Sequence, residues 1–78
     1  MEKHAVAKIA EAVEVLGGQP ALAKVLGGVH PSLVSQWVTG RLQVAARHCI
    51  AVETATNGRV TRYDLRPDVF GQTEARNG

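Results

Sequence analysis

The stretch LGGVHPSLVSQWVTG, residues 26–40, holds the pattern that decides the fold. Two glycines and a short corner precede a segment whose apolar residues, Trp37 among them, recur at helical spacing. Glycine tolerates positive φ angles, so Gly27-Gly28 is expected to end one helix. Pro31 suits the first position of the next helix, where its missing N–H is no loss. The stretch therefore predicts two short helices joined by a tight turn.

Similar signals extend outward from this joint in both directions. Residues 4–16 show the i, i+3, i+4, i+7 spacing of an amphipathic helix, which Gly17-Gly18 ends. A second helix is expected over about residues 20–26, a third over 31–40 and a fourth over 45–56, before Asn57-Gly58. The chain is therefore expected to be all-α, a compact bundle of four to five short helices.

The region after residue 58 supports two interpretations. Thr61 and Asp64 match a capping box, which predicts a short helix or 3₁₀ turn that Pro67 ends early. The alternative is an edge strand within residues 59–66, because Val60, Arg62 and Leu65 sit in an alternating pattern. Residues 1–70 are expected to form a single domain, followed by a disordered tail over 71–78.

Composition excludes several classes of protein. With 78 residues, the chain has room for one core. Its single cysteine, Cys49, can form no internal disulfide and has no cysteine neighbour for a zinc site. No segment reads as a membrane span or a signal peptide, so a cytoplasmic location is expected. No cofactor and no metal are expected. Catalysis is not expected either, because His48 and Cys49 are adjacent and would point in different directions on a helix.

Charge is distributed unevenly along the chain. The net charge is +2, but no acidic residue lies between Glu14 and Glu53. A local positive field over that stretch suits a polyanionic partner. The alternative is a solvated basic face without a partner. The basic residues and histidines of the stretch are Lys24, His30, Arg41, Arg47 and His48.

The two central helices meet the physical requirements of a helix-turn-helix. The motif needs a small residue where the helices cross, a turn residue that accepts positive φ, and apolar residues that fix the crossing angle. Ala23 and Gly27 supply the first two. Trp37 is expected in the core. The complete expected motif core is Leu22, Ala23, Leu26, Gly27, Val29, Val34 and Trp37.

The segment GGQPALAKVLGGVHPSLVSQWVTGR, residues 17–41, resembles the helix-turn-helix of Cro-type phage repressors. The later ARHCIAVETATNGRVTRYDLRPDVF, residues 46–70, resembles the continuation in the YdaS-like prophage subfamily. The resemblance implies a DNA-binding domain of the lambda-repressor-like type. Three positions depart from the pattern: Gly28 is an insertion, His30 replaces a serine, and Ala45 replaces a proline. Because the insertion falls in the turn, it is expected to lengthen the joint without rotating the second helix.

The resemblance implies a transcriptional repressor whose second helix, at about residues 31–40, lies in the major groove. Gln36 is the candidate for specificity, because an amide can pair in bidentate fashion with adenine. Two alternatives stay open: Ser32 only stabilises the helix start, and His30 is only an N-cap. The expected base contacts are His30, Ser32, Ser35, Gln36 and Thr39, and the expected phosphate contacts are Gln19, Lys24, Arg41 and Arg47.

The expected partner is a double-stranded DNA operator with two-fold symmetry, bound by a homodimer. The protein is then bacterial or phage-encoded and associated with the nucleoid when bound to DNA. The alternative function is an antitoxin, which binds a toxin protein as well as DNA. The apolar residues within 60–70 form either the dimer surface or a cover for the open side of the core; they are Val60, Tyr63, Leu65, Val69 and Phe70.

Overall fold

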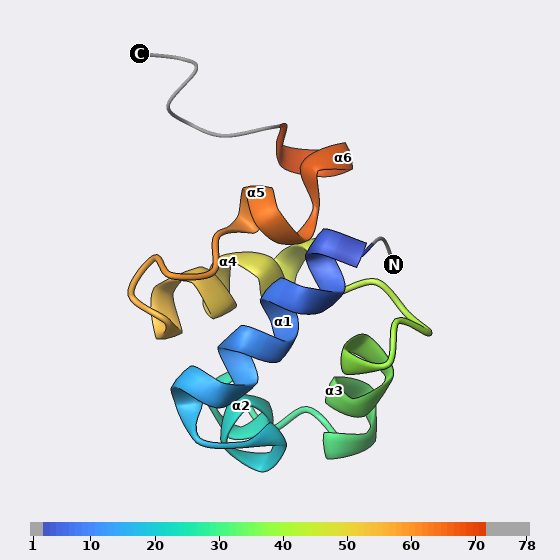
Figure 1. The fold of residues 1–78 in the computed structure, drawn as a ribbon. Helices are drawn as coiled ribbons and strands as arrows, with labels where there is room; N and C mark the ends of the chain where they lie inside the picture. The colour runs from blue at the N-terminus through green and yellow to red at the C-terminus, as the bar shows by residue number, and fades with distance from the viewer. Residues whose placement is uncertain (1–2, 72–78) are drawn as a thin grey trace.

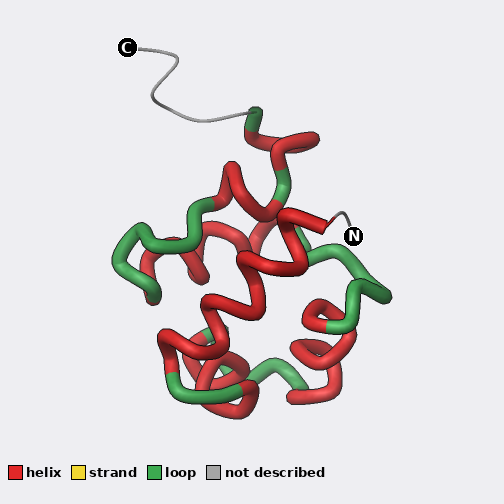
Figure 2. The backbone as a smooth tube through the Cα atoms, viewed as in Figure 1, coloured by secondary structure: helices red, strands yellow, loops and turns green. Residues whose placement is uncertain are grey.

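The computed structural model describes residues 3–71, which form helices and no strand. Figures 1 and 2 show an all-α bundle, as the sequence predicts. The predicted tail lies outside the described residues, apart from Gly71. No described helix is long and apolar enough to cross a membrane. The helices are α1 (Lys3–Leu16), α2 (Gln19–Val25), α3 (Pro31–Val38), α4 (Ala46–Ala55), α5 (Arg62–Leu65) and α6 (Pro67–Phe70).

The long helix α1 is the centre of the arrangement. It packs against α2, α3 and α5, while α4 packs against α5 and α2 (Figure 1). The apolar side chains between these helices are removed from water, which is the main favourable contribution to folding. The buried cluster consists of Ile9, Ala12, Leu22, Ala23, Val34, Trp37, Val44, Cys49, Val52, Val60 and Leu65.

The first four helices end in the same hydrogen-bonded turn. At the end of α2, the N–H of Gly28 donates to the Ala23 carbonyl at 3.0 Å, and the N–H of Gly27 donates to the Lys24 carbonyl at 3.1 Å. These two bonds define a Schellman motif, which satisfies carbonyls that the helix leaves without a partner. After α1, α3 and α4, the N–H groups of Gly18, Arg41 and Gly58 likewise donate to the carbonyl five residues earlier in the chain. Each helix therefore ends through bonds to its own last turn.

The predicted capping box forms at the start of α5. The Thr61 hydroxyl accepts from the Asp64 N–H, and the Asp64 carboxylate accepts from the Thr61 N–H, both at 3.1 Å. The alternative of an edge strand is wrong. The prediction for Pro67 needs correction as well, because it occupies the first position of α6 instead of merely ending α5. Between the two short helices, Arg66 adopts φ −139° and ψ 68°, which breaks the helix.

The apolar residues near the C-terminal end belong mostly to the core. Val60 and Leu65 are buried, and Phe70 packs against the buried cluster. Tyr63 is half-buried, and Val69 is 50% exposed. Of the two interpretations of this segment, the structure supports the cover over the core. Val60 and Leu65 are not available as a dimer surface.

Thr56, the residue that caps the C-terminal end of α4, is the one buried polar residue among residues 3–71. Its hydroxyl donates to the Val52 carbonyl at 2.9 Å and accepts from the Val60 N–H at 3.1 Å. The hydroxyl thereby satisfies a buried backbone N–H just after a helix end. Such a donor would otherwise be costly to bury.

Two carboxylates connect the C-terminal segment to the rest of the bundle. Glu53 accepts from both the backbone N–H and the Nε of Arg62 at 2.9 Å. Burial alone would raise the pKa of Glu53, but these hydrogen bonds and the Arg62 charge outweigh it, and the pKa lies below its usual value. The pKa of Asp64 is also lowered, because bonds from His4 and Thr61 outweigh burial. Both side chains are therefore held as carboxylates.

Candidate nucleic-acid interface

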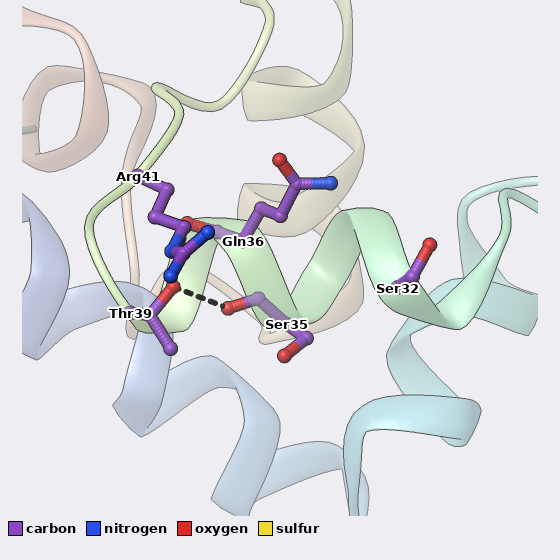
Figure 3. Close-up of a pocket in the computed structure, with 5 residues that line it drawn as sticks. All are labelled: Ser32, Ser35, Gln36, Thr39 and Arg41. Atoms are coloured by element: carbon purple, nitrogen blue, oxygen red, sulfur yellow. Dashed lines mark hydrogen bonds between the residues drawn. The ribbon is translucent and has the colours of Figure 1, made fainter.

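One face of α3 is polar and borders a shallow hollow of about 470 Å³. Positions i, i+3, i+4 and i+7 of a helix share a face. Ser32, Ser35, Gln36 and Thr39 have this spacing, and Arg41 follows the helix end (Figure 3). The structure thus brings together four of the five expected base-contacting residues and one expected phosphate-contacting residue.

The opposite face of α3 fixes the helix to the bundle. Val34 and Trp37 are fully buried, and they join Leu22 and Ala23 of α2 in the core. Ala23 is a small residue on α2, which packs directly against α3. Leu26 and Val29, which lie in the joint, pack against the same cluster. Because these contacts hold α3 by its apolar side, its polar side remains at the surface.

The joint between α2 and α3 holds both glycines, Gly27 and Gly28, within the Schellman turn. Gly27 and Gly28 have φ angles of 93° and 90°, in the left-handed region that disfavours other residues. No atom lies within 4 Å of the position that a Cβ on Gly28 would occupy. Gly28 is therefore required by the backbone conformation and not by close packing.

His30 caps the N-terminus of α3, as one of the two interpretations of this residue predicts. Its Nδ1 accepts from the Ser32 N–H at 3.1 Å and lies 2.8 Å from the Ser32 hydroxyl. A cap satisfies a donor that the helix cannot satisfy by itself. His30 and Ser32 are both exposed, so capping leaves the other atoms of each side chain accessible from solvent.

The charged residues of the stretch 15–52 differ from those in the rest of the described chain. Every ion pair between described residues lies outside residues 15–52; the pairs are His4–Asp64, Lys8–Glu11, Lys8–Asp64, Arg62–Glu53 and Arg66–Asp68. Lys24, Arg41 and Arg47 are exposed and have no acidic partner within residues 3–71. Their charges are therefore available to an anionic ligand.

Three of the expected phosphate-contacting residues do not line the hollow. Gln19 is the first residue of α2 and is partly buried, and Lys24 lies near the end of the same helix. Arg47 is exposed in the first turn of α4. A ligand much larger than the hollow would be needed to reach these residues and α3 at the same time.

Arg66, for which the sequence predicted no role, supports the segment after α3. Its Nη1 donates to the Val44 carbonyl at 3.0 Å, while its Nε and Nη2 contact the Asp68 carboxylate. Val44 is buried three residues after Arg41. The Leu-Arg-Pro-Asp stretch over residues 65–68 was the available signal, but no local pattern indicates which carbonyl the arginine reaches.

The other reactive side chains are part of the packing. Burial raises the pKa of the Cys49 thiol to about 11, so the thiol is protonated at neutral pH. The His48 ring lies 5.6 Å from the Trp37 ring, and burial and the Arg47 charge lower the pKa of His48. Within residues 3–71, no group of three or more potential ligands is placed to hold a metal ion.

The joint, the buried face of α3 and its polar outer face together define a helix-turn-helix protein of the small all-α class. The chain belongs to the YdaS family: the sequence model of the family described as "Bacterial toxin YdaS" matches residues 9–74. A protein of Escherichia coli K12 named "Putative transcriptional regulator YdaS" is 48% identical over 59 residues, which are 76% of this chain. The chain spans about 59% of that relative's length. Comparison with solved structures gave no significant match.

Proposed function

We propose that this chain is a sequence-specific DNA-binding transcriptional regulator, a Cro-like repressor encoded by a prophage. It binds a two-fold operator as a homodimer, with α3 in the major groove. The name of the E. coli relative supports the regulatory part of this proposal. The observation that carries the DNA-binding part is the set of four polar side chains along the outer face of α3, with Arg41 just after the helix, around one hollow.

The geometry of α3 suits base recognition. A helix in the major groove meets base edges with the side chains on its outer face. Gln36 offers a donor and an acceptor on one amide, and these match the N7 acceptor and the N6 amino donor of adenine. His30, Ser32, Ser35 and Thr39 complete the proposed base-contacting set.

Phosphate contacts are proposed for the side chains around this face. Arg41 directly follows α3 and has no acidic partner among the described residues, so it serves as the main charged contact. Lys24, Arg47 and the backbone at Gln19 reach phosphates farther along the groove. A homodimer would place two copies of α3 about 34 Å apart, one helical turn of DNA.

The first experiment is fluorescence anisotropy with labelled duplexes. The DNA immediately upstream of the coding region is compared with a scrambled duplex of the same composition, at two salt concentrations. The proposal expects tight binding that weakens with salt and favours the upstream sequence. Equal binding to both duplexes excludes an operator in this upstream DNA, and a random library that also yields no preferred duplex contradicts a sequence-specific regulator.

Gln36→Ala tests base recognition. Removing one bidentate contact is expected to reduce discrimination at a single base pair by about 1–3 kcal/mol. The matched control is Gln43→Ala, because Gln43 is exposed but lies outside the hollow. Binding is measured on a panel of single-base-pair variants of the preferred duplex. An equal loss on every duplex would remove Gln36 from the base-contacting set.

Arg41→Ala tests the phosphate contact. The variant is expected to bind all duplexes more weakly and to lower the slope of log affinity against log salt by about one. Arg59→Ala removes the same charge from the loop after α4, on the other side of the bundle from α3 (Figure 1), and serves as control. A salt slope that is the same for Arg41→Ala and wild type would contradict the contact.

The family description supports a second candidate, a component of a toxin–antitoxin pair that binds a protein partner as well as DNA. Induced expression in a bacterial host is compared for wild type and Gln36→Ala. Growth arrest that the substitution relieves indicates toxicity through DNA binding. Growth arrest that persists in the variant favours a protein target, to be identified by co-purification.

A further inference from the structure

The hydrogen bonds within α3 determine the direction in which its outer side chains can bond to a ligand. We infer that Ser32 and Thr39 act only as hydrogen-bond acceptors toward operator bases and accept from exocyclic amino groups of those bases. His30 presents a donor from Nε2. This inference rests on the proposed function. The sequence alone leaves a hydroxyl free to donate or accept. The structure removes this freedom at two of the positions.

The donor at His30 follows from its role as a cap. A backbone N–H can only donate, so the 3.1 Å bond from the Ser32 N–H requires a lone pair on Nδ1. The neutral ring then carries its proton on Nε2. This N–H belongs to an exposed side chain and can donate to a phosphate oxygen, to guanine N7 or O6, or to thymine O4.

The same lone pair determines the direction of the Ser32 hydroxyl. Ser32 Oγ lies 2.8 Å from Nδ1, and because Nδ1 carries no proton, the hydroxyl is the donor in this contact and shares the single Nδ1 lone pair with the Ser32 N–H. Its one hydrogen is used in this bond, and only lone pairs are left for a ligand. A phosphate oxygen also offers only lone pairs. Ser32 is therefore unsuited to a phosphate contact and suited to the amino group of adenine or cytosine.

Thr39 is restricted in the same way by the backbone of its own helix. Its Oγ1 donates to the Ser35 carbonyl at 3.0 Å (Figure 3) and also lies 3.3 Å from the Gln36 carbonyl. The exposed side of the Thr39 hydroxyl thus also presents lone pairs. Ser35 differs, since its hydroxyl makes none of the hydrogen bonds found within residues 3–71, and it remains free to donate or accept.

The first test concerns the free protein and requires no DNA. Long-range proton–nitrogen correlation spectra at neutral pH distinguish the two tautomers of each histidine ring. The expected result for His30 is a proton on Nε2 and none on Nδ1. A proton on Nδ1 overturns the inference at once, whatever the protein binds.

The second test uses the preferred duplex selected from a random library. Each adenine is replaced in turn by purine, which lacks the amino group, or by 7-deaza-adenine, which lacks the N7 acceptor; each cytosine is replaced by 2-pyrimidinone. One amino deletion is expected to weaken wild-type binding about three- to tenfold more than it weakens Ser32→Ala, the effect of one hydrogen bond. Deletion of an amino group at a different position is expected to weaken wild-type binding more than it weakens binding by Thr39→Val, by the same factor.

The controls separate this inference from the proposed function. Ser35→Ala removes a different hydroxyl from the same face. The structure leaves the Ser35 hydroxyl free to donate or accept. Coupling of Ser32 to N7 or to the salt slope overturns the inference, and so does specific binding without any coupling to Ser32 or Thr39. If the library yields no preferred duplex, the proposed function fails and the inference fails with it.

Discussion

Replacing Thr56 by valine exchanges a buried hydroxyl for a methyl group of nearly the same size. The hydroxyl is the acceptor for the Val60 N–H, and Val60 is fully buried. An unsatisfied buried donor costs about 1–3 kcal/mol, since water cannot replace the lost acceptor. The added methyl group offsets this by about 0.8 kcal/mol of apolar burial. The Val52 carbonyl loses its bond from the Thr56 hydroxyl but keeps its helical bond from the Thr56 N–H at 3.0 Å. Losing the hydroxyl bond at this carbonyl therefore costs little.

The expected result is a decrease of about 1–2 kcal/mol in the free energy of unfolding. For a domain of this size, such a decrease lowers the midpoint of thermal unfolding by about 5–15 °C. Both quantities are measured by circular dichroism, in urea and on heating. Amide hydrogen exchange gives a local measure, because the Val60 N–H should lose protection beyond the global change in stability.

Thr56→Ser is the control, because it keeps the hydroxyl and removes only the methyl group. Its Val60 N–H should remain protected even where the smaller side chain lowers stability. The reasoning is refuted if Thr56→Val is as stable as wild type. It is also refuted if both variants lose the same stability with no change in exchange at Val60, since the hydroxyl would then contribute only through packing.

Two further perturbations test the joint and the C-terminal segment. Gly28→Ala is expected to lower stability by about 1–2 kcal/mol, because alanine is strained at a φ of 90° although its Cβ has space; an unchanged urea midpoint would contradict this conformation. Glu53 contributes stability as a carboxylate, since its folded pKa is lowered. That contribution is present above its unfolded pKa of about 4.3 and is lost as pH falls through the lower folded value. Glu53→Gln should therefore be less stable than wild type at pH 7, with the difference shrinking toward pH 3, whereas a difference independent of pH would argue against the ion pair with Arg62.

The boundaries of the first four helices and the start of α5 could be predicted from the sequence because the signals are local. Gly17-Gly18 and Gly27-Gly28 end their helices with bonds to the preceding turn, and Thr61 caps α5 through a residue three positions later. The polar face of α3 is likewise a matter of spacing along one helix. These features depend on residues close to one another in the sequence, at most seven positions apart.

Two of the features that the sequence did not predict depend on distant contacts. The break at Arg66 accompanies a bond to the Val44 carbonyl, 22 residues away. Burial of Val60 and Leu65 depends on how the C-terminal segment packs over the core, so their apolar character alone left a dimer surface possible. The directions of the hydroxyl bonds at Ser32 and Thr39 required atomic positions that no residue pattern specifies.

The repeated Schellman turns have a consequence for how the chain reaches its fold. Each of the first four helices carries its own stop, so a growing helix ends at the right residue before any tertiary contact exists. Chains dominated by such local contacts fold in microseconds to milliseconds, because little loop-closure entropy is lost before contacts form. The length of a connection can then change without moving a helix boundary, because the bonds that end each helix lie within its own last turn.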